Sequence, residues 1–282
     1  MIYDINGNAL SVVYNKDGIT TNPAYDVNGN AISVAPELTV MTYNYQWSAG
    51  LNSLAYQQEI YNKYKPDIIG IQEASAQGQK AWPSVAQTSL ADYPYKYLSD
   101  YYNYSGLASK ISLEDVTDNP FASQAGSGIY TYQKCYLDVG GKRIAWFNTH
   151  LEYDTTQGSL NRKYAQATEL FNAVEEEDYA IVTGDFNMYG LDLESADYVG
   201  VGKKFADAGY NMANWTEDNF VMTWTDAKSA TSLSEFIEAD DNIITSPNID
   251  IVSIIFDTTK LSYINNVNVL DHIPVIARVR IN

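Results

Sequence analysis

Short apolar runs that stop abruptly on a polar residue recur along this chain, and they restrict its fold more than any other feature. In "AIVTGDFNMYG" (180–190), a run of strand length gives way at once to Asp185 and Asn187. Similar runs stop at Asn44 in "TYNYQ" and at Glu73 in "GIQEA". A strand end at the rim of a sheet holds such side chains rigidly and leaves them open to a ligand. The pattern therefore favours sheets that share a polar edge.

Helical segments are interleaved with these runs. Residues 52–67 predict a helix that stops near Pro66, and residues 160–174 predict a second helix capped by Ser159. The segment "QKCYLDVGGKRIAWFNTHL" (133–151) predicts two strands joined by a Gly-Gly turn. Interleaved strands and helices, with hairpins among the strands, favour a mixed-sheet α/β sandwich flanked by helices.

The first residues contain one short motif twice, as "YDINGNALS" (3–11) and "YDVNGNAIS" (25–33). Each copy centres on Asn-Gly, the favoured pair for a tight hairpin turn, so the repeats predict two small β-hairpins. Two such hairpins bury little apolar surface. We therefore expect residues 1–35 to form a docking or attachment segment and residues 36–282 to form one catalytic domain.

The chain has 282 residues and is 45% hydrophobic, which is enough for one sizeable core. No apolar run approaches the ~20 residues that a membrane span needs. The single cysteine, Cys135, excludes an internal disulfide framework and predicts a buried core thiol. We expect a soluble protein, either cytoplasmic or secreted with a signal peptide that lies outside this sequence.

The charge balance restricts the partners. The chain has 17 basic and 35 acidic residues, which gives a formal net charge of −18. Such a field repels polyanions and opposes a broad nucleic-acid surface. It permits a local phosphate site, because a bound divalent cation dominates the field close to it.

Eight polar residues end or open the strand-like runs, and both histidines of the chain are among them. They are Asn44, Glu73, His150, Asp185, Asn187, Asp250, Asp271 and His272. Carboxylate and amide oxygens are the hard ligands that Mg²⁺, Mn²⁺ and Ca²⁺ prefer. Taken singly, each residue has an ordinary explanation, such as a turn cap or a buried core histidine. Their recurrence at strand ends favours one shared site.

The ordered set "MTYN", "PDIIGIQE", "NTHL", "GDFN", "IDIV" and "DHIPV" resembles the motifs of the endonuclease/exonuclease/phosphatase superfamily. The resemblance extends from about Leu38 to the C-terminus. It implies a deoxyribonuclease-I-like, four-layer α/β sandwich, in which two mixed β-sheets pack face to face with helices outside. It also implies a phosphoester hydrolase, a phosphodiesterase or phosphatase, that depends on Mg²⁺ or Mn²⁺, with Ca²⁺ as a further candidate.

The resemblance also implies roles for individual residues. Glu73 would be the principal metal ligand, with Asn44 beside it and Asp271 as a further carboxylate of the metal site. Asp185 and Asn187 would orient the attacking water and hold the phosphate or a second metal. No covalent nucleophile motif such as G-x-S-x-G is present, so we expect direct attack by water.

The two histidines would complete the catalytic set. His272 would act as general base or polarise the phosphate, steered by Asp250. His150 would contact a phosphate oxygen or assist the leaving group. Arg162 would lie close enough to contact substrate, although a solvated helix residue is an equal alternative. Which group accepts the proton of the water stays open.

The substrate is less constrained than the chemistry. Nucleases of this superfamily commonly have a basic residue just after the glutamate, where this chain has Ala74. A small molecule, a lipid headgroup and a nucleic acid are all candidate phosphoester substrates. One alternative is a metal-dependent endo- or exonuclease on DNA. A second is a catalytically vestigial surface protein that docks through the N-terminal repeats.

Overall fold

The computed structural model describes residues 2–3, 9–10, 23–25, 31–33, 35–45, 54–74, 89–101, 105–124, 129–225, 233–258 and 271–282. The main body contains two six-stranded sheets. The first sheet has the spatial order β13 (Asn211–Met212), β14 (Asp241–Thr245), β12 (Ala180–Asp185), β11 (Lys142–His150), β10 (Thr131–Val139) and β9 (Glu114–Pro120). The second has the order β15 (Ile249–Phe256), β16 (Val275–Ile281), β5 (Glu37–Asn44), β6 (Ile68–Gln72), β8 (Gly106–Ser109) and β7 (Tyr95–Leu98).

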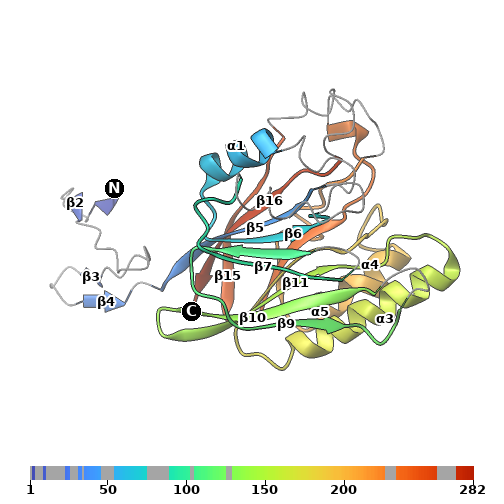
Figure 1. Ribbon diagram of the computed structural model, residues 1–282, viewed down its shortest axis with the longest axis horizontal. Coiled ribbons are helices and arrows are strands. Elements are labelled where there is room, and N and C mark those ends of the chain that lie inside the picture. The colour runs from blue at the N-terminus through green and yellow to red at the C-terminus, as the bar shows by residue number, and fades with distance from the viewer. Residues whose placement is uncertain are drawn as a thin grey trace.

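Both sheets are mixed, because each has one parallel pair among antiparallel ones. The parallel pairs are β11 with β12 and β5 with β6. The sheets pack face to face, and helices cover the two outer faces (Figure 1). Within the described ranges, the helices are α1 (Leu54–Tyr64), α3 (Gln157–Val174), α4 (Ala196–Val201) and α5 (Lys203–Asp207), with the 3₁₀ turn η2 (Leu233–Glu235). This arrangement confirms the predicted four-layer α/β sandwich.

Strand alternation explains the layers. Along β5, Val40 points into the core between the sheets, whereas Met41 packs under α1. In the first sheet, Ile181 faces the same central core and Val182 packs under α3. Because both faces of each sheet are covered, the central strands are apolar along almost their whole length. Cys135 lies in the central core, as predicted, and its burial raises the pKa of the thiol to about 12.

The helix boundaries follow local signals, with one correction. Helix α1 ends before Pro66, as the sequence predicts. The N-cap of α3 is Thr156, whose side chain accepts from the backbone N–H of Ser159, so the expectation that Ser159 is the cap is wrong. Ser159 instead begins the buried face of α3, and that face includes Lys163.

A polar network joins the two sheets just below one end of the sandwich. The Gln72 side chain donates to Asn148 Oδ1 over 2.8 Å, and Thr183 Oγ1 lies 3.0 Å from the same oxygen. Asn148 in turn donates to the carbonyl of Ile71 over 3.0 Å. Gly70 allows this close approach, since a Cβ there would collide with Thr183 and Asn148. The ends of β6, β11 and β12 are therefore held at fixed mutual positions.

A two-stranded antiparallel sheet overlaps each N-terminal repeat. The first pairs β1 (Ile2–Tyr3) with β2 (Ala9–Leu10), and the second pairs β3 (Pro23–Tyr25) with β4 (Ala31–Ser33). The docking role of residues 1–35 and the division at residue 36 stay predictions. Among the residues that the structure describes, no helix is long and apolar enough to cross a membrane.

Candidate active site

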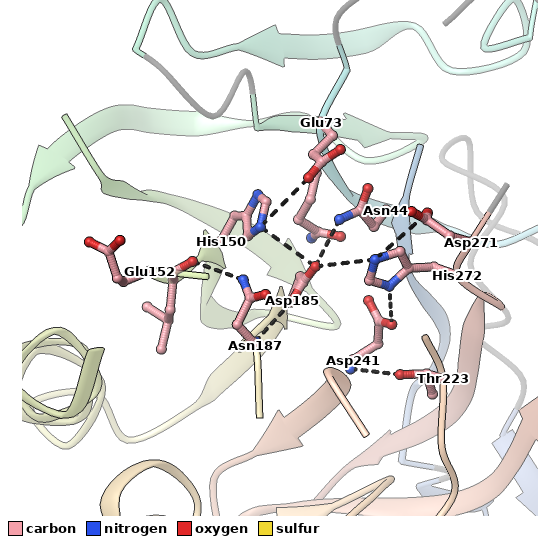
Figure 2. A network of polar contacts seen from close by, with 12 residues as sticks. Asn44, Glu73, His150, Glu152, Asp185, Asn187, Thr223, Asp241, Asp271 and His272 are labelled. Atoms are coloured by element: carbon pink, nitrogen blue, oxygen red, sulfur yellow. Dashed lines mark hydrogen bonds and ion pairs between the residues drawn. The ribbon is translucent and has the colours of Figure 1, made fainter. Parts of the chain in front are cut away.

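The strand order brings the predicted polar residues to one end of the sandwich. The parallel strands β5 and β6 carry Asn44 and Glu73 at their carboxyl ends, and β11 and β12 carry His150 and Asp185 at theirs. Strand β16 is antiparallel to β5, so His272, just before it, lies at the same end. Figure 2 shows these side chains pointing toward one another. The sequence prediction of a shared polar edge agrees with this geometry.

Asp185 lies at the centre of the cluster and is 1% exposed. Asn44 donates to its Oδ2 over 2.7 Å and so ties the two sheets together. The backbone N–H of Asn187 donates to its Oδ1 over 2.9 Å. The Nε2 atoms of His150 and His272 each lie 3.6 Å from Asp185 Oδ2, from opposite sides. Burial tends to raise the pKa of Asp185, but His150, His272 and these hydrogen bonds outweigh it and lower the pKa.

The carboxylate that orients His272 is Asp241, at the start of β14. Its Oδ2 lies 2.8 Å from His272 Nδ1, and its backbone N–H donates to Thr223 Oγ1 over 3.0 Å (Figure 2). A carboxylate on one ring nitrogen fixes the orientation of the other. Although burial opposes the charged form, the carboxylates led by Asp241 hold the pKa of His272 well above its ordinary value of 6.5.

The assignment of this role to Asp250 is wrong. Asp250 is exposed on β15 and lies opposite Arg280 near the far end of β16. Arg280 lies five positions along β16 from Val275, the first residue of the strand. At the rise of an extended strand, this corresponds to about 17 Å. Asp250 therefore cannot contact His272.

Glu73 and Asp271 form a second, more open part of the cluster. Glu73 Oε1 lies 3.9 Å from His150 Nε2, and Asp271 Oδ1 lies 3.9 Å from His272 Nε2. Asp271 Oδ1 is buried and has no hydrogen-bond partner among the residues that the structure describes. Burial, with Glu73 nearby, raises the pKa of Asp271 to about 6 although His272 opposes this. Two carboxylates with an unsatisfied buried oxygen are the donor set expected for a hard divalent cation.

Two residues of the cluster have a left-handed backbone conformation, which residues other than glycine rarely adopt. The φ angle of Glu73 is +54° and that of Asn187 is +49°. The Asn187 side chain donates to the carbonyl of Leu151 over 2.9 Å, which holds the loop after β12 against the loop after β11. Such conformations persist only where surrounding contacts impose them, and they are frequent at functional sites.

Arg162 lies beside the cluster. Its Nε lies 3.3 Å from a carboxylate oxygen of Glu152, a residue that is 3% exposed. Its Nη2 donates to Ser159 Oγ over 2.7 Å. Gln166 accepts from the backbone N–H of Glu152 over 3.0 Å. Both side chains therefore support the segment after His150, and contact between Arg162 and substrate stays a prediction.

Sequence reasoning missed three residues of this region, namely Asp241, Thr223 and Lys163. The signal for Asp241 was an aspartate opening the apolar run "NIIT", just as Asp271 precedes another. The signal for Lys163 was its helical spacing with Ala167, Leu170 and Val174, which are all buried.

In the described part of the chain, Asp185, Asp241 and His272 also lie close enough to share a metal ion, because their ligand atoms are within 4.8 Å of one another. The 2.8 Å contact between Asp241 and His272 Nδ1 matches an imidazole–carboxylate hydrogen bond. This contact holds the imidazole of His272 in one orientation.

Comparisons with known proteins agree with this architecture. No protein-family model and no curated protein matches the chain. An endonuclease/exonuclease/phosphatase from Beutenbergia cavernae superposes with a TM-score of 0.70 at 13% identity, covering 87% of this chain and 72% of the other. One from Bacteroides vulgatus gives 0.66 at 17% identity, covering 87% and 99%. TDP2 from D. rerio, in complex with a single-stranded DNA product, gives 0.67 at 15% identity, covering 86% and 99%.

At these identities the likeness concerns the fold. The matches cover 86–87% of this chain, in proteins of the kind that the sequence motifs resemble. The chain therefore has the endonuclease/exonuclease/phosphatase fold.

Proposed function

We propose that this chain is a divalent-metal-dependent phosphoester hydrolase, a phosphodiesterase or phosphatase that uses activated water. The observation that carries the proposal is the placement of two imidazole Nε2 atoms, each 3.6 Å from Asp185 Oδ2, beside the carboxylates of Glu73 and Asp271. Hydrolysis of a phosphoester needs charge neutralisation on the phosphoryl oxygens, an aligned water and help for the leaving oxygen. This cluster offers groups for all three tasks.

The metal would be held on the open side of the cluster. Glu73 and Asp271 would supply carboxylate oxygens and Asn44 its amide oxygen, and Mg²⁺ or Mn²⁺ suits these donors better than a soft metal. A cation bound there would neutralise charge on the phosphoryl group. The unsatisfied buried oxygen of Asp271 supports this assignment.

The remaining residues would act on water and phosphate directly. Asp185, held at both oxygens by Asn44 and Asn187, would orient the attacking water. His272, oriented by Asp241, and His150 would donate to phosphoryl oxygens from opposite sides of Asp185. Because the supporting contacts come from both sheets, these groups are positioned before substrate binds.

The substrate class favoured by charge is a small or lipid-headgroup phosphoester. Burial, followed by the negative charge of Asp185, raises the pKa values of the neighbouring Glu238 and Asp240 carboxyls, so the surroundings of the site already disfavour further negative charge. The nearby cations Arg162 and Lys163 are engaged by Glu152 and Asp197. These features and the net charge of −18 oppose a long polyanion. DNA is the second candidate, supported by the likeness to a TDP2 structure that holds a single-stranded DNA product.

The decisive experiment is hydrolysis with Mn²⁺ or Mg²⁺, with wild type beside His272→Ala. The panel contains bis-(p-nitrophenyl) phosphate, the mono-ester, an inositol phosphate, sphingomyelin and plasmid DNA. We expect turnover of a small or lipid ester that falls by at least ~100-fold in the variant. DNA cleavage lost in the variant would favour the nuclease. A folded wild type that hydrolyses nothing and gains no stability from metal would favour the vestigial surface protein.

A further inference from the structure

Lys163 is a fully buried lysine that the proposed chemistry leaves without a role. It lies on the inner face of α3 and its side chain is 0% exposed. A buried ammonium group is costly unless it is paired and hydrogen-bonded. Its Nζ lies 2.6 Å from the backbone oxygen of Asn187 and 3.3 Å from Asp197 Oδ1. It also lies 4.1 Å from the centre of the Tyr189 ring. Asn187 and Tyr189 belong to the loop after β12, and Asp197 hydrogen-bonds to that loop.

That loop carries Asn187 in its left-handed conformation, with a φ of +49°. On one side, Asn187 is held by Asp185 and by the carbonyl of Leu151. On the other side, Lys163 binds its carbonyl, and Asp197 accepts from the backbone N–H of Tyr189 over 3.1 Å. Asp197 also accepts from the Tyr164 hydroxyl over 2.7 Å, so the carboxylate is itself fixed. Lys163 and Asp197 thus hold both ends of the short segment 187–189.

We propose that Lys163 is a positioning residue of the candidate active site, whose ammonium group holds the Asn187 carbonyl so that Asn187 and Asp185 keep their catalytic geometry. This inference rests on the proposed function. Removal of the ammonium would free the Asn187 carbonyl and let the strained backbone relax. Asp185 would then lose the N–H that orients its Oδ1. The contacts of Lys163 that the structure describes are with Asn187, Asp197 and Tyr189 rather than with Glu73 or Asp271, so metal binding would be retained.

The test compares Lys163→Met, which keeps the length but removes the charge and the donor, with Lys163→Arg. Lys204→Met is the matched control. Lys204 is partly buried and, like Lys163, donates to a backbone carbonyl, that of Gly200, over 2.7 Å. Its contacts, however, lie in α3 and α4 rather than in the loop after β12. For each full-length variant, kcat and KM for bis-(p-nitrophenyl) phosphate with Mn²⁺ are measured, together with the melting temperature with and without Mn²⁺.

We expect Lys163→Met to lower kcat by about 100-fold, the effect of a misplacement of about 1 Å, with KM changed by less than about threefold. The rise in melting temperature on adding Mn²⁺ should match that of wild type. Lys163→Arg should recover at least about tenfold of the lost kcat, since it keeps charge and donors. Lys204→Met should lower the melting temperature without this loss of kcat.

A Lys163→Met protein whose kcat stays within about threefold of the Lys204→Met value would overturn the inference, as would loss of the Mn²⁺ effect together with activity. If methionine prevents folding, Lys163→Leu, which also lacks a donor, replaces it, and a wild-type kcat in that variant overturns the inference equally. A wild type that hydrolyses no phosphoester overturns the proposed function and this inference with it. An active wild type with an unaffected variant overturns the inference alone.

Discussion

Asp241 contacts His272 of the candidate site, and its environment supports that contact. The carboxylate is fully buried, its backbone N–H is bound by Thr223, and its Oδ2 lies 2.8 Å from His272 Nδ1. Burial raises the pKa of Asp241, although the histidine opposes this. A buried carboxylate of this kind fixes which ring nitrogen faces the substrate.

Asp241→Asn should therefore lower kcat/KM by about 100-fold or more, because an amide on Nδ1 no longer favours the same imidazole tautomer and charge. The measurement is the initial rate with bis-(p-nitrophenyl) phosphate and Mn²⁺. Asp250→Asn is the matched control, since Asp250 is exposed and remote. Equal losses of kcat/KM in the two variants would contradict the role of Asp241 in orienting His272.

Glu238 should make the stability of the protein depend on pH. Burial, followed by the charge of Asp185, raises the pKa of its carboxyl to about 7. The folded state therefore binds this proton more tightly than the unfolded chain, whose carboxyl has a pKa near ~4.3. The resulting stability is present below pH ~4.3 and is lost as pH rises through about 7. Because the side chain is half-buried, screening reduces the effect to about 1 kcal/mol.

Glu238→Gln should consequently be more stable than wild type at pH 8, and this advantage should shrink toward pH 5. The difference in melting temperature between variant and wild type, followed from pH 5 to 8.5, provides the check. Glu114→Gln, on the exposed edge strand β9, is the matched control. A flat profile for Glu238→Gln would contradict the burial of this carboxyl beside Asp185.

At the scale of elements, the contact between the sheets decides where the functional strand ends lie. Asn148 of β11 donates to the carbonyls of Ile71 and Gly106 and to Gln133, and accepts from Gln72 and Thr183. These bonds join β6, β8, β10, β11 and β12 immediately below Glu73, His150 and Asp185. A fully satisfied buried network of this kind rigidifies the elements that it joins.

Asn148→Ala should destabilise the protein by about 3 kcal/mol, because several buried polar groups lose their partners at once. Urea denaturation with a two-state fit gives the change in unfolding free energy. Asn161→Ala, on the exposed face of α3, should stay within about 0.5 kcal/mol of wild type. A similarly small effect at Asn148 would show that the sheets do not depend on this network.

At the scale of the whole molecule, bound metal should stabilise the folded chain, because the proposed ligands come from both the first and last thirds of the main body. Glu73 follows β6 and Asp271 precedes β16, so only the folded state brings them together. At a Mn²⁺ concentration of about 100 times Kd, mass action stabilises the folded state by about 2.7 kcal/mol, or about 5 °C in melting temperature.

Glu73→Gln should abolish most of that rise, whereas Glu114→Gln should keep it. Differential scanning fluorimetry with 0 to 1 mM Mn²⁺ at fixed ionic strength is the measurement. An unchanged rise in melting temperature for Glu73→Gln would show that the metal binds elsewhere. The next ligands to test would be Asp185, Asp241 and His272.

Much of this architecture follows from local patterns in the chain. Local patterns predict the strands β5, β6, β10, β11 and β12, the end of α1 before Pro66 and the buried Cys135, since each depends on neighbouring residues. The polar residues at those strand ends predict most of the cluster, because alternation and strand length decide where a run stops. The partner of His272 does not follow in this way. Asp241 and Asp250 both neighbour apolar runs, and only strand pairing distinguishes them.

The sequence alone therefore determined the strand-and-helix order, the acidic character and the identities of Asn44, Glu73, His150, Asp185, Asn187, Asp271 and His272 as one candidate set. Tertiary structure alone decided which side chains meet. Asn44 and Asp185 are 141 positions apart and bond because two sheets pack face to face. Asp241 reaches His272, and Lys163 reaches Asn187, through the same long-range packing. Local periodicity encodes which face of an element is buried, whereas the partner across that face depends on register between distant segments.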